Sequence, residues 1–198
     1  MNQTATFSFD ALSRAMIKSD HPGPPPEDMF RPTSVMALME FESSPNLIFI
    51  QKADVAGYPW RNQMAFPGGH WDPGDGSRKA TALRELEEEM GISKRHVDVI
   101  GSLGHFQTIN QRDIEAFVGV WDQEQEICAD ASEIQRVFHI PVGHLLDVHM
   151  EKGLNGRTPG FDELTYPYED VVIWGATAKI LHHFMEIIRA EVMSSCSG

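Results

Sequence analysis

The nine residues from Arg84 to Ile92 constrain the fold more than any other segment. They read Arg-Glu-Leu-Glu-Glu-Glu-Met-Gly-Ile, and in a helix Glu85, Glu88 and Glu89 would stand at i, i+3 and i+4 on one face. Like charges at this spacing destabilise a helix by roughly 0.2 to 0.5 kcal/mol per pair. The pattern therefore predicts a helix whose glutamates are compensated by a cation, and carboxylate oxygens suit a hard divalent ion.

The same helix, expected over residues 77–90, has an apolar face that should pack inward. The apolar residues are Ala82, Leu83, Leu86 and Met90. Gly91 follows where a left-handed C-terminal cap favours glycine. The alternative for an acidic run is a solvated helix face, which most runs of like charge form.

Together with Phe66-Pro67-Gly68-Gly69, this segment resembles the Nudix box of the Nudix hydrolase superfamily. Its Arg-Glu-x-x-Glu-Glu-x-Gly core, residues 84–91, matches the signature at every defining position. The resemblance implies an α/β fold, an α/β/α sandwich with a mixed sheet, a central Nudix helix and a C-terminal helix. It also implies a set of catalytic residues, namely Arg84, Glu85, Glu88 and Glu89. The implied ligands of Mg²⁺ or Mn²⁺ are Glu85, Glu88, Glu89 and Gly69.

The loop before the helix departs from the usual box. Counting back from Arg84 places His70 at the usual glycine and Gly76 at the usual glutamate, so the loop is one residue longer. Asp72 and Asp75 are the nearby acids that could do the missing carboxylate's work. The alternative, favoured by the sequence Asp-Pro-Gly-Asp-Gly, is that both aspartates only form a turn.

Three further segments resemble the coenzyme A diphosphatase branch of the superfamily. They are residues 72–85 in the long loop, 133–147 and 173–177. This resemblance implies cleavage of coenzyme A or acyl-CoA to 3′,5′-ADP and the phosphopantetheine portion. The segment before the double glycine departs from the branch, because its expected arginine and glycine fall on Gly57 and Arg61 or on Tyr58 and Asn62. ADP-ribose, nucleotide sugars and dinucleoside polyphosphates therefore stay as alternative substrates.

The candidate substrate-binding residues lie around the double glycine and on a later strand. Lys52 and Arg61 could contact the remaining substrate phosphates, whereas Phe66 and Gly68 belong to the double-glycine segment. Glu115 is a candidate for a further acid near the site. The alternatives are solvated basic side chains near a turn and an ordinary solvent-facing glutamate.

Composition limits the other function classes. A chain of 198 residues with 41% hydrophobic residues can bury one core, and its net charge of −13 disfavours binding along a phosphate backbone. No secretory pattern and no apolar run of roughly 20 residues is present, so a cytoplasmic location and no membrane partner are expected. Cys128 and Cys196 are too far apart in sequence to indicate a zinc site. A nucleotide-sensing module without catalysis is an alternative function, and an interaction protein that uses the long last helix is another. Formation of a homodimer stays open.

The expected organisation is a helix and Pro-rich linker over 1–30, the main domain over 31–192 and a disordered tail over 193–198. Helix 8–18 should precede paired strands at 35–41 and 47–51 and at 97–109 and 114–121. A further strand ends at 138–141, followed by one or two helical turns over 142–148 and a flexible loop over 153–162. The chain should close with a long helix over 171–192, which buries Ile180, Phe184 and Ile187.

Overall fold

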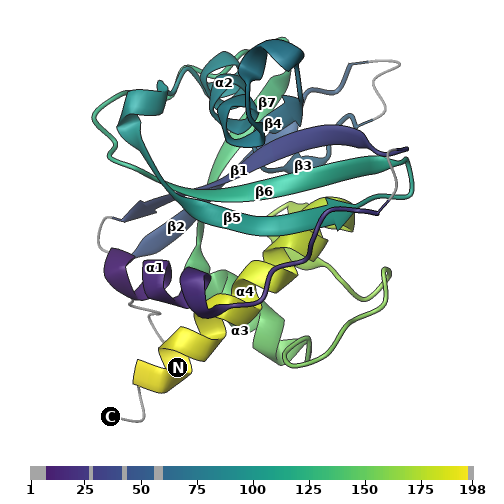
Figure 1. Ribbon diagram of the computed structural model, residues 1–198. Coiled ribbons are helices and arrows are strands. Elements are labelled where there is room, and N and C mark those ends of the chain that lie inside the picture. The colour runs from purple at the N-terminus through teal and green to yellow at the C-terminus, as the bar shows by residue number, and fades with distance from the viewer. Residues whose placement is uncertain (1–7, 27–28, 42–43, 56–59, 196–198) are drawn as a thin grey trace.

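The computed structural model describes residues 8–26, 29–41, 44–55 and 60–195, with side chains described as far as residue 191. Helix α2 covers one face of a curved sheet, and α1, α3 and α4 lie on the other face (Figure 1). The helices are α1 (Phe9–Lys18), η1 (Pro73–Asp75), α2 (Arg78–Met90), η2 (Lys94–His96), α3 (Val142–Glu151) and α4 (Gly175–Ser195). The strands are β1 (Arg31–Phe41), β2 (Pro45–Lys52), β3 (Met64–Ala65), β4 (Gly68–His70), β5 (Val97–Gln107), β6 (Arg112–Trp121), β7 (Ile134–Pro141), β8 (Tyr166–Tyr168) and β9 (Val171–Ile173). The predicted α/β/α sandwich is confirmed.

The main sheet has seven strands and is mixed. Strand β1 runs parallel to β6 along residues 31–39 and 112–120, and on its other edge it pairs antiparallel with β2 and β4. Strand β2 also pairs antiparallel with β3 and β7, and β5 pairs antiparallel with β6. This pairing brings the start of β6 and the double-glycine strand β4 to opposite edges of β1, beneath α2.

Both faces of the central strands are buried, because consecutive side chains of a strand point to opposite faces. On β1, Met36 and Leu38 join the core cluster under α2, where Leu86 is fully buried. Ala37 and Met39 join the larger cluster formed with α1, α3 and α4. The apolar face predicted for the acidic helix therefore packs on the sheet, and its glutamates lie at the edge of that contact.

The N-terminal helix is confirmed, with Ser8 as its N-cap, and it contributes Leu12 and Met16 to the core shared with α4. Helix α4 buries Ile180, Phe184 and Ile187 as expected. It continues to Ser195, which is three residues into the segment expected to be a disordered tail.

Several element boundaries differ from the sequence expectation; strand β1, for example, begins at Arg31 and not at residue 35. The closing helix begins at Gly175 and not at 171, because Val171–Ile173 pairs with β8 as a strand. A run of β-branched residues favours a strand, and the left-handed φ of +67° at Gly175 suits the change of direction. Helix α3 extends to Glu151 and is longer than expected. Between residues 8 and 195, apart from the gaps given above, no helix is both long and apolar enough to cross a membrane.

Candidate active site

Helix α2 is fixed at both ends by its own sequence. The Ser77 side chain accepts a hydrogen bond from the Ala80 N–H at 3.1 Å, which caps the first turn. Gly91 adopts the left-handed conformation, with φ of +71°, and its N–H donates to the Glu87 carbonyl at 2.9 Å. The predicted cap is confirmed, and the glutamates in between have a defined orientation.

Glu89 points inward from α2 and is only 3% exposed. One carboxylate oxygen accepts a hydrogen bond from the Lys52 ammonium, and the other accepts one from the Gly68 N–H at 2.9 Å. Burial raises the pKa of Glu89, whereas Lys52 and the Gly68 N–H oppose that shift. Lys52 therefore serves as the internal counter-ion of Glu89 and has little exposed surface to offer a substrate.

Glu85 is half-buried and lies directly over the double glycine. A Cβ atom added to Gly69 would collide with the Glu85 carboxylate, so the absence of a side chain at Gly69 creates the space for that carboxylate. Burial raises the pKa of Glu85, and Arg84, whose Nη1 lies 2.9 Å from Oε1, lowers it. The Glu85 carboxylate and the Gly69 backbone, both predicted to bind a metal ion, are therefore neighbours.

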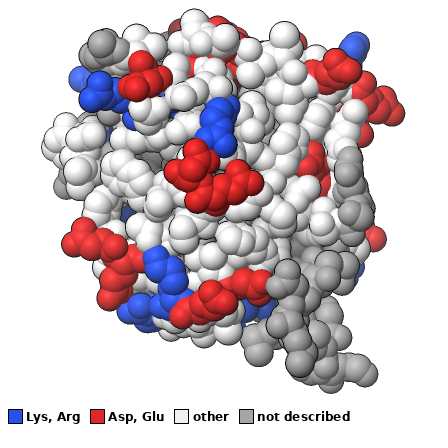
Figure 2. All heavy atoms as spheres, turned by 180° about the vertical axis from the view of Figure 1, so that it is seen from behind, with Lys and Arg blue, Asp and Glu red and all other residues white. Residues whose placement is uncertain are grey.

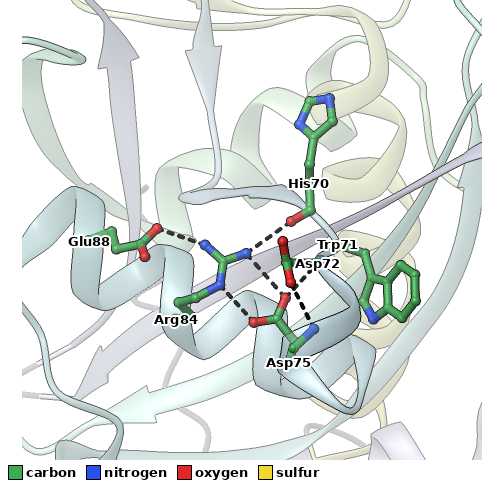
Figure 3. Close-up of a pocket in the computed structure, with 7 residues that line it drawn as sticks. His70, Trp71, Asp72, Asp75, Arg84 and Glu88 are labelled. Carbon is green, nitrogen blue, oxygen red and sulfur yellow. Dashed lines mark hydrogen bonds and ion pairs between the residues drawn. The ribbon is translucent and has the colours of Figure 1, made fainter.

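Arg84 binds several carboxylates at once (Figure 3). Its Nε donates to Asp75 Oδ1 at 2.7 Å, its Nη1 to Glu88 Oε2 at 2.7 Å, and its Nη2 to the His70 carbonyl at 3.0 Å. Glu88 is the exposed member of this group, with 58% of its side chain accessible. A planar guanidinium suits such multiple contacts, and the role expected for Arg84, orienting the carboxylates, fits this geometry.

Asp75 lies in the long loop and binds the Arg84 guanidinium through both of its carboxylate oxygens. The Arg84 guanidinium, followed by hydrogen bonds from the Asp72 N–H and the Thr81 hydroxyl, holds the pKa of Asp75 well below its usual range. Asp72 meanwhile accepts from the Gly74 N–H at 2.7 Å and caps the short helix η1. The expected turn is present, and within it Asp75 anchors Arg84 of α2.

Replacing Asp75 tests this anchoring. The Asp75→Asn variant is expected to lose about 1 to 3 kcal/mol of unfolding free energy at pH 7, because charge-assisted hydrogen bonds to Arg84 are lost. Because the pKa of Asp75 is depressed in the folded protein, the ionised carboxylate stabilises the fold at pH values above its ordinary pKa of 3.8. This stabilisation is lost as the pH falls toward the folded-state pKa. Urea unfolding should therefore show a large difference at pH 7 and a smaller one near pH 3. The exposed Asp98→Asn variant should match the wild type at both pH values.

A cavity of about 470 Å³ opens beside this group. Its lining residues are His70, Trp71, Asp72, Gly74, Asp75, Arg84 and Glu88. In Figure 3, Glu88 and Asp75 flank Arg84, and the rings of His70 and Trp71 extend away from it. A small substrate can therefore approach Arg84 and Glu88 from solvent.

The donor chemistry fits a hard divalent cation, since Glu85 and Glu88 offer carboxylate oxygens and Gly69 offers a backbone carbonyl. The three glutamates are not drawn into one tight set, because Lys52 holds Glu89 inward and Arg84 holds Glu88. Among the residues that the structure describes, the one group of three metal-ligand atoms lying within 4.8 Å of one another is His96, Asp122 and Glu124. That group lies at the opposite end of β6 from Glu115, is partly exposed, and follows the C-terminal end of α2, where Gln125 donates to the Gly91 carbonyl.

The other predicted substrate residues differ in their surroundings. Arg61 is exposed, with Nε 3.9 Å from Asp54 Oδ1. The Phe66 ring is buried and stacks on Phe49 with 4.6 Å between ring centres, so it packs in the core and has little surface to offer a substrate. Gly68 contributes its N–H to Glu89 rather than to open solvent.

Glu115 is half-buried on the sheet face below α2, and its Oε2 lies 3.7 Å from Arg78 Nε and 3.8 Å from His105 Nε2. It is therefore not the ordinary solvent-facing glutamate of the alternative interpretation. Gly57 and Tyr58 lie outside the described residues. Asn62 has a φ of +59°, the left-handed conformation that glycine favours, which is consistent with a glycine position there.

Sequence reasoning missed the two long-range contacts of the site. Lys52 ends a buried apolar strand, and a lysine in such a place needs a counter-ion, which was a usable signal. Arg112 stacks on Trp60, with 4.6 Å between the guanidinium carbon and the ring centre. These residues are far apart in the chain, and nothing local to either indicates the contact.

Comparisons with known proteins agree with this fold and box. A family model described as the NUDIX domain matches residues 29–171. The "Uncharacterized Nudix hydrolase NudL" of Yersinia pestis (strain Pestoides F) is 34% identical, and the similarity covers 72% of this chain and 72% of that protein. The MutT protein from Methanosarcina mazei Go1 shares the fold with a TM-score of 0.54 at 15% identity, over 84% of this chain and 98% of that chain. The E. coli ORF135 protein also shares the fold, with a TM-score of 0.50 at 18% identity, over 84% of this chain and 97% of that chain. The chain therefore belongs to the Nudix hydrolase family.

Proposed function

We propose that this protein hydrolyses the diphosphate linkage of a nucleoside diphosphate derivative, with coenzyme A or acyl-CoA as the substrate. The observation that carries the proposal is the arrangement of Arg84 with Asp75, Glu85 and Glu88 beside an open cavity. The resemblance of the long loop and of residues 133–147 and 173–177 to the coenzyme A diphosphatase branch supports the choice of substrate.

The reaction needs positive charge, because a diphosphate repels an incoming nucleophile. Glu85 and Glu88, with the Gly69 carbonyl, would hold Mg²⁺ or Mn²⁺, and Glu89 would join them on leaving Lys52. A bound divalent ion neutralises phosphate oxygens and lowers the pKa of water. Arg84 contacts both Glu85 and Glu88, of which Glu88 lines the cavity, and Asp75 keeps Arg84 in place.

The space at Gly69 gives a direct prediction. The Gly69→Ala variant is expected to fold, because the added Cβ meets only the far end of the flexible Glu85 side chain. It is expected to lose on the order of 10- to 100-fold in kcat, because Glu85 must leave the position that Gly69 allows. The Gly101→Ala variant, which meets nothing within 4 Å, is the matched control and should keep full activity. Equal activity of the two variants would argue against a role for the Glu85 position.

The remaining features of the proposal follow from charge and organisation. We expect a small nucleotide as the partner, and neither nucleic acid nor membrane, for a cytoplasmic protein whose net charge is −13. On the face seen in Figure 2, basic side chains lie in small groups next to acidic ones, with no continuous basic surface among the residues described there. The helix and linker of residues 1–30, the domain of 31–192 and a homodimer through α4 stay as proposals.

A substrate panel tests the proposed function. Purified protein is incubated with Mg²⁺, and in parallel with EDTA, in the presence of coenzyme A, ADP-ribose, a nucleotide sugar or a dinucleoside polyphosphate. The proposal predicts Mg²⁺-dependent release of 3′,5′-ADP from coenzyme A at the highest kcat/KM. Turnover of another substrate with coenzyme A untouched would replace the assignment within the family, and no turnover of any of them would contradict it.

A further inference from the structure

A second group of side chains lies next to the cavity, on strands β6 and β4 and in the segment before β3. Arg112 is half-buried at the start of β6, and its guanidinium lies over the Trp60 ring. Arg112 Nη1 donates to His70 Nε2 at 2.5 Å, since a guanidinium has no acceptor. His70 thereby connects the two sites, because its backbone carbonyl accepts from Arg84 while its ring accepts from Arg112.

Strand pairing brings a second guanidinium to the same place. In the parallel pairing of β1 with β6, Arg31 is the partner of Arg112, so two arginines start neighbouring strands. The cavity is reached through His70, which lines it and contacts Arg112. In a chain with 29 acidic and 16 basic residues, two adjacent arginines beside an acidic centre are an unusual arrangement. Like charges on neighbouring strands repel, and an anion with two negative charges would relieve the repulsion.

We propose that Arg112 and Arg31 bind a phosphate monoester that the substrate carries outside its diphosphate, with Trp60 holding the Arg112 guanidinium in position. The proposal rests on the proposed function and narrows its substrate class to nucleoside diphosphate derivatives that bear an additional phosphate on the ribose. A guanidinium group often donates two parallel hydrogen bonds to one phosphate group. Stacking on an aromatic ring fixes the orientation of its planar set of donors. His70 lies between Arg84, which its carbonyl contacts, and the proposed subsite, which its ring contacts.

In the competing interpretation Arg112 has a purely structural role, because its contact with Trp60 only holds residues 60–63 in position. The two interpretations differ in what the Arg112→Gln variant would lose. If the role is structural, the variant should lose the same factor in kcat/KM for every substrate and should also be less stable to heat. A phosphate subsite affects only substrates with the extra phosphate, so the ratio of two kcat/KM values separates the interpretations.

The test uses two pairs of probes that differ by one phosphate. Coenzyme A and dephospho-coenzyme A are compared by kcat/KM, and 3′,5′-ADP and 5′-ADP are compared by calorimetric binding, which needs no turnover. For the Arg112→Gln variant we expect kcat/KM for coenzyme A and affinity for 3′,5′-ADP to fall on the order of 10- to 100-fold, because a charged hydrogen bond is lost. Values for the probes without the extra phosphate should change less than about threefold, within the range of a surface substitution. Arg31→Gln should show a smaller loss that is selective for the same probes. Arg14→Gln, at an exposed position of α1, should leave both kcat/KM and affinity unchanged.

The outcomes separate the two proposals. Equal losses for both members of a pair, or a wild type that binds 3′,5′-ADP no more tightly than 5′-ADP, would overturn the phosphate subsite. A wild type that cleaves neither coenzyme while retaining selective 3′,5′-ADP binding would overturn the proposed substrate and support the subsite. If Arg112→Gln unfolds, the exposed Arg31→Gln variant decides through the same two ratios.

Discussion

The Glu88→Gln variant is expected to lower kcat on the order of 100-fold or more, because a neutral amide would hold the proposed divalent ion far less well than a carboxylate does. A bound divalent ion stabilises the charge of the transition state by several kcal/mol. The same change should barely affect folding. Glu88 is 58% exposed and its contact with Arg84 is an exposed helix pair, which is worth about 0 to 1 kcal/mol. Steady-state kinetics and thermal unfolding of the same sample measure both quantities.

Glu87→Gln is the matched control for this prediction. Glu87 is the preceding residue of α2, is exposed and carries the same charge, but it points away from the box face. It should retain wild-type kcat. If both variants lose activity equally, the general negative charge of α2 and not the position of Glu88 matters, and if neither loses activity the site is misassigned.

The Lys52→Met variant is expected to lose about 3 to 5 kcal/mol of unfolding free energy without metal, because removing one partner of a buried ion pair leaves the other charge uncompensated. Glu89 is 3% exposed, Lys52 is 8% exposed, and the Gly68 N–H would remain as the carboxylate's hydrogen-bond donor. Urea unfolding in EDTA at pH 7 measures the loss. Burial already raises the pKa of Glu89, so the deficit should shrink as the pH falls and Glu89 takes up a proton.

Two further variants separate the ion pair from general effects of the substitution. The double variant Lys52→Met with Glu89→Leu should recover much of the lost stability, because no buried charge is left unpaired. Lys79→Met, at an exposed position of α2, should remain near the wild type. A double variant less stable than Lys52→Met alone would show that the charge pair is not the source of the loss.

The elements that sequence predicted well are those specified by neighbouring residues. The caps Ser77 and Gly91 and the apolar spacing of α2 lie within one short segment, so the Nudix helix was predictable to within a residue. The strand at Val171–Ile173 was missed because a helical period and a β-branched run overlap there. Only its pairing with β8 selects the strand, and the β8 residues that pair with it lie three to seven positions earlier in the chain.

The site was predictable only where the box specifies it. The motif identified Arg84 and the three glutamates, but their separation into buried Glu89, half-buried Glu85 and exposed Glu88 depends on Lys52 from β2. The roles of Asp75 and Arg112 depend on contacts made by folding, namely the loop turn and the start of β6. No local pattern encodes which acid meets which base across a sheet.

The most direct test of the central proposal is calorimetric titration of Mn²⁺ into the wild type and two variants. If the box glutamates hold the metal, the wild type and His96→Ala bind alike, and the double variant Glu85→Gln with Glu88→Gln loses binding. Binding that survives the loss of both glutamates but disappears in His96→Ala would place the metal at the group formed by His96, Asp122 and Glu124 and would contradict the proposed active site.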